Sequence, residues 1–333
     1  MAEAAIQYLQ DREAIRSLLE RYYKAVDSSD LDLMKTVFLP DGTWNFNKGS
    51  LLCNGMDEIW AIIGPVGNNP AMHFMGNHFV QISGDAAKSD TYGIAHVVRK
   101  ATPTSPERDG LQGLRYQDFL VRTKDGWRVK ARTQLVEWQR GDLLLEPTNA
   151  KNRELGKAFK TPEHWRQAPQ PIGPNVSSKD PLIQDLIDRQ ALRDLMTRYY
   201  YCVDRYDFEG VKSIFTPDAF LDFNAGTWRD SGVDKISKMI SGIYSNRLTF
   251  HFMGTQRIDV QGDTANMDTY AMAHHLKPAG DHELDTVWGL RYVDQAVRTK
   301  DGWRVKHRTM IADWKRESPS DRLVHAPMRW TFK

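Results

Sequence analysis

The sequence is short of several features that would assign it to a specialised class of protein. It has two cysteines, Cys53 and Cys202, in 333 residues, too few for a disulfide framework. Its formal net charge is +2, from 45 basic and 43 acidic residues, so neither nucleic acid nor an anionic membrane is expected as a partner. No apolar run approaches the roughly 20 residues of a membrane-spanning helix. The N-terminus lacks the pattern of a signal peptide, and we therefore expect a cytoplasmic protein.

What the sequence does contain is a duplication. His73-Phe-Met-Gly recurs as His251-Phe-Met-Gly, and the ten residues from Val121 recur from Val297. A period of about 177 residues is far longer than the unit of a solenoid, and it indicates two copies of one ordinary domain. We predict a first domain at 1–147, a tail and linker rich in Pro, Asn and Lys at 148–180, and a second domain at 181–333.

Each copy places helices before strands. Residues 14–27 carry an apolar stripe at helical spacing, with Asp27 at its end, and residues 191–204 repeat it with Asp204. A short helix capped by Ser29 or Asp30, a short strand at 43–46 and a helix at 55–63 follow. Four longer strands are then predicted at 72–83, 88–100, 114–123 and 127–138, the last two joined by a hairpin turn. This order predicts an α+β domain in which a curved antiparallel sheet wraps around the helices.

Five chemically capable residues recur at nearly constant spacing in both copies. A carboxylate on the apolar side of a helix is costly unless another group pairs with it, so Asp27 and Asp204 each need a partner. The recurring set is Tyr22, Asp27, His73, His96 and Arg132 in the first copy and Tyr199, Asp204, His251, His274 and Arg308 in the second.

These motifs resemble the SnoaL-like branch of the nuclear transport factor 2-like superfamily, which includes scytalone dehydratase, bile-acid 7α-dehydratase and hexachlorocyclohexane dehydrochlorinase. The resemblance implies a cone-shaped antiparallel sheet closed by helices, an α+β barrel with a ligand cavity. It implies that Asp27 orients His73, and Asp204 orients His251, as the general base. It also implies substrate-binding roles for Tyr22, Trp44, His96, Arg132, Tyr199, His274 and Arg308. The second copy departs from this pattern, with Leu221 at the position of Trp44.

The chemistry that suits these residues is elimination. A histidine can remove an acidic C–H proton near neutral pH, and a buried aspartate fixes its tautomer. We therefore predict a cofactor-independent lyase that eliminates water, halide or formaldehyde from a small apolar cyclic or aromatic substrate. A double-bond isomerase with the same base and a non-catalytic small-molecule carrier are the alternatives. We expect no metal or other cofactor, because no Cys or Glu completes a zinc set around His73, His96 and Asp27. The resemblance also implies use of the open sheet face for assembly, which predicts a homo-oligomer; packing of the two repeats sheet to sheet within one chain is the alternative.

Overall fold

The computed structural model describes residues 2–46, 51–101, 103–104, 106–141, 177–224, 226–246, 248–280 and 282–320. They divide into two compact units, of which one holds the first repeat from Gln10 onward and the other holds the second repeat. The predicted linker at 148–180 falls almost wholly outside the described residues, as does the predicted boundary at residue 147. The helix that opens the second repeat begins at Pro181.

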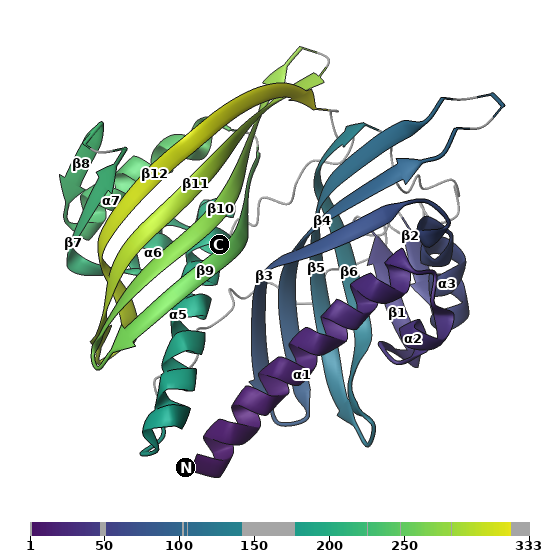
Figure 1. The fold of residues 1–333 in the computed structure, drawn as a ribbon, viewed down its shortest axis with the longest axis horizontal. Coiled ribbons are helices and arrows are strands. Elements are labelled where there is room, and N and C mark those ends of the chain that lie inside the picture. Colours follow the sequence, from purple (N-terminus) through teal and green to yellow (C-terminus); the bar gives the residue numbers. More distant parts are fainter. Residues whose placement is uncertain are drawn as a thin grey trace. The chain divides into compact units, whose positions relative to one another are not determined.

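The first repeat follows the predicted order of helices before strands. Figure 1 shows its long helix lying along the sheet, with the shorter helices at the end where β1 and β2 pair. Its elements are α1 (Ala2–Asp27), α2 (Leu31–Lys35), β1 (Phe38–Phe46), β2 (Leu51–Asn54), α3 (Met56–Ile63), the 3₁₀ helix η1 (Gly64–Asn68), β3 (Ala71–Ser83), β4 (Ala86–Arg99), β5 (Arg108–Thr123) and β6 (Gly126–Gly141).

The second repeat has the same elements in the same order. They are α5 (Pro181–Asp204), α6 (Phe208–Lys212), β7 (Phe215–Phe223), β8 (Trp228–Ser231), α7 (Val233–Ile240), η3 (Ser241–Ser245), β9 (Leu248–Gln261), β10 (Thr264–Ala279), β11 (His282–Thr299) and β12 (Gly302–Ser320). The last strand, β12, is the longest of the second repeat and continues to Ser320.

Each repeat forms one six-stranded sheet, in the order β2-β1-β6-β5-β4-β3 or β8-β7-β12-β11-β10-β9. The α+β prediction is confirmed, with two corrections. Neither sheet closes into a barrel. Neither is wholly antiparallel, because β1 runs parallel to β6 and β7 runs parallel to β12. The four long strands form the predicted antiparallel meander. The edge strands β3 and β9 belong to this meander, and each carries the predicted histidine of its repeat.

The apolar stripes of the two long helices form the centre of each core. Ile15, Leu18, Leu19, Tyr22 and Val26 are at most 3% exposed, as the helical spacing predicts. The second stripe is buried as well, at Leu192, Leu195, Met196, Tyr199 and Val203. Helix α1 starts twelve residues before the predicted position, since residues 2–13 contain neither proline nor glycine to stop it. Each aspartate thus lies in the last turn of a helix fixed by its apolar face.

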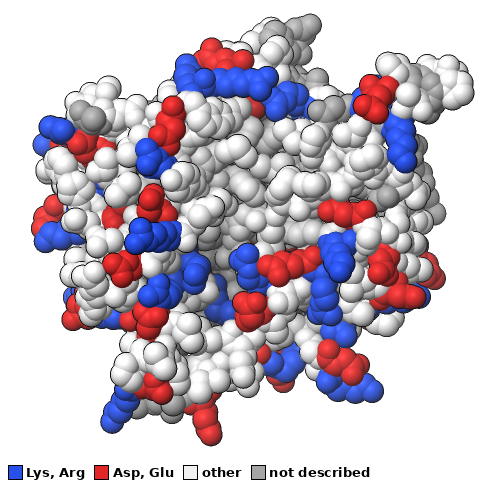
Figure 2. All heavy atoms as spheres, in the orientation of Figure 1, with Lys and Arg blue, Asp and Glu red and all other residues white. Residues whose placement is uncertain are grey.

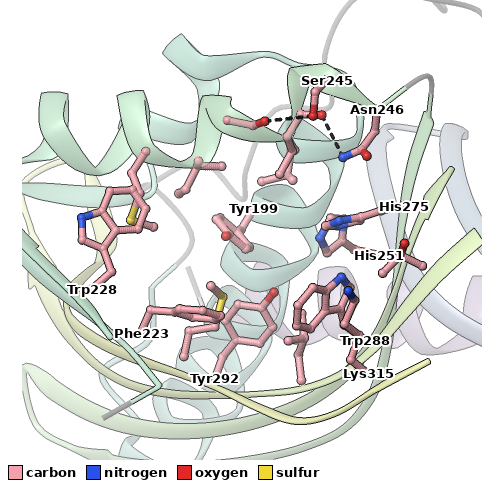
Figure 3. A pocket seen from close by; sticks show the side chains of 18 of the residues that line it. Tyr199, Phe223, Trp228, Ser245, Asn246, His251, His275, Trp288, Tyr292 and Lys315 are labelled. Atoms are coloured by element: carbon pink, nitrogen blue, oxygen red, sulfur yellow. Dashed lines mark hydrogen bonds between the residues drawn. The ribbon is translucent and has the colours of Figure 1, made fainter. Parts of the chain in front are cut away.

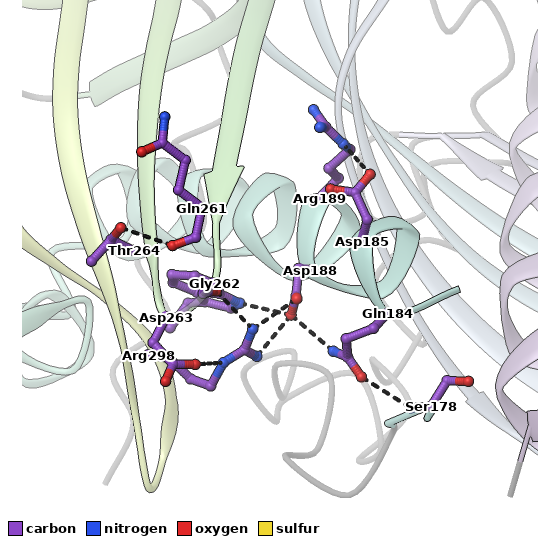
Figure 4. Close-up of polar contacts among 11 residues, drawn as sticks. Ser178, Gln184, Asp185, Asp188, Arg189, Gln261, Gly262, Asp263, Thr264 and Arg298 are labelled. Carbon is purple, nitrogen blue, oxygen red and sulfur yellow. Dashed lines mark hydrogen bonds and ion pairs between the residues drawn. The ribbon is translucent and has the colours of Figure 1, made fainter. Parts of the chain in front are cut away.

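An ion pair fixes the N-terminal half of α5 to its sheet (Figure 4). Arg298 on β11 donates from Nη1 and Nη2 to the two carboxylate oxygens of Asp188, at 2.8 and 2.7 Å. Asp188 also accepts from Trp303 Nε1 at 3.1 Å and from Gln184 Nε2 at 3.1 Å. Arg298 Nε donates to Asp263 at 2.8 Å. The ion pair therefore holds α5 against β11 before the helix reaches Asp204.

The first repeat contains the same tie. Arg122 donates to both oxygens of Asp11 at 2.6 and 2.7 Å, and Trp127 Nε1 donates to Asp11 at 3.2 Å. The matched contacts show that the duplication preserves the placement of the helix as well as the residues at its end.

The charged side chains on the face shown in Figure 2 are of mixed sign, with acidic and basic groups interspersed. Several form exposed pairs, such as Lys130 with Asp41 and Arg16 with Glu20. This mixture agrees with the small net charge of the chain. In the part of the chain that the structure describes, no helix is both long enough and apolar enough to cross a membrane.

Candidate functional site

In the first repeat, the end of α1 meets the first residues of β3. The Oδ1 atom of Asp27 lies 2.6 Å from Nδ1 of His73, and its Oδ2 atom accepts the backbone N–H of His73 at 3.0 Å. The imidazole is 6% exposed and the carboxylate 25%. A neutral imidazole that donates from Nδ1 to a carboxylate keeps Nε2 as a hydrogen-bond acceptor, and this geometry suits that tautomer.

The second repeat reproduces this geometry. Asp204 Oδ1 lies 2.6 Å from His251 Nδ1, and Oδ2 accepts the His251 backbone N–H at 2.9 Å. Thr249 Oγ1 adds a third hydrogen bond, to Asp204 Oδ1 at 3.0 Å. A negative charge at a helix C-terminus opposes the helix dipole, so these donors also offset the cost of placing the carboxylate there. The predicted contact between acid and imidazole is thus present in both repeats.

In each repeat, the imidazole stacks on a tyrosine that the sequence analysis did not identify as a site residue. Tyr23 stacks on His73 with ring centroids 5.8 Å apart, and Tyr200 stacks on His251 at 5.9 Å. The predicted Tyr22 lies one residue earlier and packs edge-on against Tyr23. Burial raises the pKa of both Tyr22 and Tyr23, so both phenols are neutral at pH 7. The repeated Tyr-Tyr dipeptide, one helical turn before each aspartate, is the sequence feature that could have indicated this second tyrosine.

The two arginines predicted to face a substrate are instead buried in ion pairs. Arg132 donates from Nε and Nη2 to Asp118 at 2.7 and 2.8 Å, and it is 1% exposed. Arg308 binds Asp294 in the same way and is 0% exposed. Burial opposes the charge of each arginine, but the neighbouring carboxylate outweighs burial and raises the pKa of the guanidinium.

Both arginines also contact the tyrosines of the long helices. The guanidinium of Arg132 lies 4.0 Å from the ring centroid of Tyr22, and that of Arg308 lies 4.2 Å from the ring centroid of Tyr199. Each arginine is paired because its strand register sets it directly opposite the aspartate of the neighbouring strand. The alternation of residues along one strand could not identify that partner.

The second repeat contains a cavity of about 380 Å³ beside its Asp–His pair. Figure 3 shows His251, His275 and Trp288 near one end of it, and Phe223 and Trp228 near the other. Its lining comes from the long helix, the short helices and the concave face of the sheet: Tyr199, Val203, Phe223, Trp228, Met239, Ile240, Gly242, Ile243, Ser245, Asn246, His251, His275, Lys277, Thr286, Trp288, Leu290, Tyr292, Met310, Lys315 and Glu317.

The histidine that accompanies His251 in this cavity is His275 and not the predicted His274. His251 is directly opposite Ala273, so side chains two residues from Ala273 share its face and His274 points to the other face. There His274 Nδ1 lies 2.8 Å from Asp285 Oδ2. The rings of His251 and His275 have centroids 5.5 Å apart. Burial, and then the neighbouring His251, His274 and Lys277, lower the pKa of His275 to about 3, which leaves it neutral at pH 7.

The same register corrects the prediction for His96. His73 is opposite Ala95, and His96 is opposite Met72, so His96 lies on the sheet face away from His73. The residue equivalent to His275 in the first repeat is Val97, which is 2% exposed. The two repeats therefore share the Asp–His pair but not the second cavity histidine.

Trp44 is a core residue of the first repeat. It is 1% exposed and packs against Phe46 with ring centroids 5.8 Å apart. Its counterpart Leu221 is equally buried and does not line the second cavity, whereas Phe223 and Trp228 do. Within the described residues, no group of three His, Cys, Asp or Glu side chains is arranged to hold a metal ion.

Comparison with known proteins assigns both repeats to one family. The model of the SnoaL-like domain matches residues 7–133 and 184–309. An uncharacterized protein of Mycobacterium tuberculosis is 32% identical over 127 residues, which are 38% of this chain and 86% of that protein. The terrestric acid biosynthesis cluster protein E of Penicillium crustosum is 32% identical over 140 residues, covering 39% of this chain and 85% of that protein.

Among solved structures, a hexachlorocyclohexane dehydrochlorinase of Novosphingobium barchaimii matches 40% of this chain and 92% of its own, with 16% identity and a TM-score of 0.36. Since the family model spans most of both repeats, this chain belongs to the SnoaL-like domain family and carries the domain twice.

Proposed function

We propose that the chain is a cofactor-independent lyase of the dehydratase type. The observation that carries this proposal is the pairing of Asp204 with His251 at the wall of a largely apolar cavity. With Nδ1 bound to the carboxylate, Nε2 is the nitrogen able to accept a proton from a ligand. The Penicillium relative, named for a biosynthetic gene cluster, supports a small molecule as the substrate.

The reaction that suits this arrangement begins with removal of a C–H proton from the substrate by Nε2 of His251. The electron pair of that bond forms a new carbon–carbon double bond, and the group on the adjacent carbon leaves with its bonding electrons. Where the leaving group is hydroxide, it takes the proton back from Nε2 of the imidazolium and departs as water, which restores the neutral base. Asp204 stabilises the imidazolium that forms, and Tyr200 holds the ring in position. In the first repeat, Asp27 and His73 have the same roles.

The apolar lining favours a cyclic or aromatic substrate. A screen of hydroxylated aromatic and terpenoid compounds, read as ultraviolet absorbance of a new conjugated double bond and as loss of mass, identifies substrates. An isomerase with the same base gives a product of unchanged mass. A carrier gives no turnover with any compound.

Substitution of the aspartates then tests the mechanism. Asp204→Asn and Asp27→Asn keep the size of the side chain but remove the charge that orients the imidazole. We expect each to lose the part of the rate that its repeat supplies, and the double variant to lose about 10²-fold to 10⁴-fold. Asp41→Asn, at an exposed pair with Lys130, is the control. A double variant with wild-type turnover rejects the proposed base.

A further inference from the structure

The cavity of the second repeat is polar at one end and apolar at the other. His251, His275, Trp288, Lys315 and Glu317 belong to the polar end, and side chains such as Phe223, Trp228 and Met239 line the rest. In Figure 3 the labelled members of these two groups lie on opposite sides of the cavity. A ligand with one polar group therefore has a preferred orientation, with that group beside His251.

Strand register explains how this polar end is built. His251, Ala273, Trp288 and Lys315 form one row across four strands, each residue directly opposite the next. Ala273 is the smallest member of the row and is buried between the two rings' strands. The next row on the same face consists of Thr249, His275, Thr286 and Glu317.

The equivalent rows of the first repeat keep the base and change the rest. His73, Ala95, Gln112 and Gln139 form the first row. Gln112 Nε2 donates to Gln139 Oε1 at 3.0 Å, and both amides are buried. A neutral amide pair thus replaces Trp288 and Lys315. In the second row, Ala71, Val97, Gly110 and Gly141 replace every polar side chain.

Lys315 is the group of the polar row best placed to bind an anion. Its Nζ lies 5.3 Å from the ring centroid of Trp288 and 2.7 Å from Glu317 Oε1. The side chains of Lys315 and Glu317 are 46% and 47% exposed, and an ion pair so exposed is weak. Lys277 adds a second positive charge to the lining. A carboxylate that enters the cavity can therefore replace Glu317 as the partner of Lys315 at little cost.

We propose that the second repeat selects a cyclic ligand that carries an acidic group, with the anion on Lys315 and the ring against Trp288. The first repeat, with Gln139 at the position of Lys315, does not make this selection. The position of Lys277 is basic in both repeats, because its counterpart is Arg99. The position of Lys315 is basic only in the second repeat, so it is the position that distinguishes the two repeats. This inference rests on the proposed function, because it takes the cavity beside His251 as the substrate site.

The test compares two probes of similar shape, 2-naphthoate and the neutral 2-naphthalenemethanol, by isothermal titration of the full chain at pH 7. We expect 2-naphthoate to bind one site per chain. Lys315→Gln, which installs the residue of the first repeat, weakens 2-naphthoate about tenfold and leaves the alcohol unchanged. Glu317→Gln removes the competing carboxylate and strengthens 2-naphthoate. Lys306→Gln, on the same strand but outside the cavity lining, is the matched control and changes neither probe.

Three results would overturn the inference: equal weakening of both probes by Lys315→Gln, unchanged binding of 2-naphthoate, or two equivalent 2-naphthoate sites per chain. The measurement requires no turnover, so its failure is distinguishable from failure of the proposed lyase. If the double aspartate variant keeps its rate while Lys315→Gln loses 2-naphthoate, the catalytic proposal fails and the binding inference stands.

Discussion

The tie between Arg298 and Asp188 makes a quantitative prediction about stability. Asp188 is 4% exposed and accepts hydrogen bonds from Arg298, Trp303 and Gln184. Asp188→Asn removes the charge and one acceptor while keeping the size of the side chain. Charge-assisted hydrogen bonds contribute about 1.5–3 kcal/mol each. The side chain of Arg298 is 33% exposed, so solvent screens part of its attraction to Asp188. We therefore expect the free energy of unfolding to fall by about 2–3 kcal/mol.

The other carboxylate on the same guanidinium supplies the control. The side chain of Asp263 is 82% exposed, so Asp263→Asn is expected to cost less than about 1 kcal/mol. Urea unfolding followed by tryptophan fluorescence measures both variants, and Asp11→Asn tests the equivalent tie of the first repeat. If Asp188→Asn costs no more than Asp263→Asn, the buried ion pair does not stabilise the helix as argued.

Two further predictions concern buried charge. Asp294→Asn leaves the charge of Arg308 without its carboxylate in the core, and we expect the free energy of unfolding to fall by about 3–5 kcal/mol. Asp313→Asn, at the exposed pair with Arg291, is the control and is expected to cost under about 1 kcal/mol. Equal losses of stability in thermal or urea unfolding would contradict the burial argument. His275, with its pKa lowered to about 3, binds a proton less readily folded than unfolded, where its pKa is about 6.5. The free energy of unfolding therefore falls as the pH drops from 7 towards 3, and His275 accounts for about 2 kcal/mol of that fall between pH 7 and pH 5. Unfolding curves of His275→Gln should show a smaller fall over this range than those of the wild type.

The sequence predicts the parts of the molecule that depend on spacing along one element. The stripe that ends in Asp204 has a helical period, and the position of His251 follows from a repeated motif at the start of a strand. Both features are local, and the structure brings the two residues into contact. The parallel pairing of β1 with β6 is different, because no local pattern encodes which strand a short segment joins.

Cross-strand register was the main information that the sequence could not supply. A slip of one residue exchanges the two faces of a strand, and this decides between His274 and His275 as the neighbour of His251. The same limit applies to Arg308, whose partner Asp294 lies on the adjacent strand. Polar residues that alternate along a strand predict that one face is special, but the pairing with neighbouring strands determines which face it is.

The division of labour among the strands has a consequence for how such a duplicated chain can diversify. The acid comes from a helix and the base from the edge strand β9, whereas Trp288, Lys315 and Glu317 come from β11 and β12. If the proposed roles hold, substitutions on those two inner strands change the residues that line the cavity and leave the proposed base in place. Exchanging only Trp288, Lys315 and Glu317 for their counterparts in the first repeat is then a direct way to alter which ligand the second repeat binds.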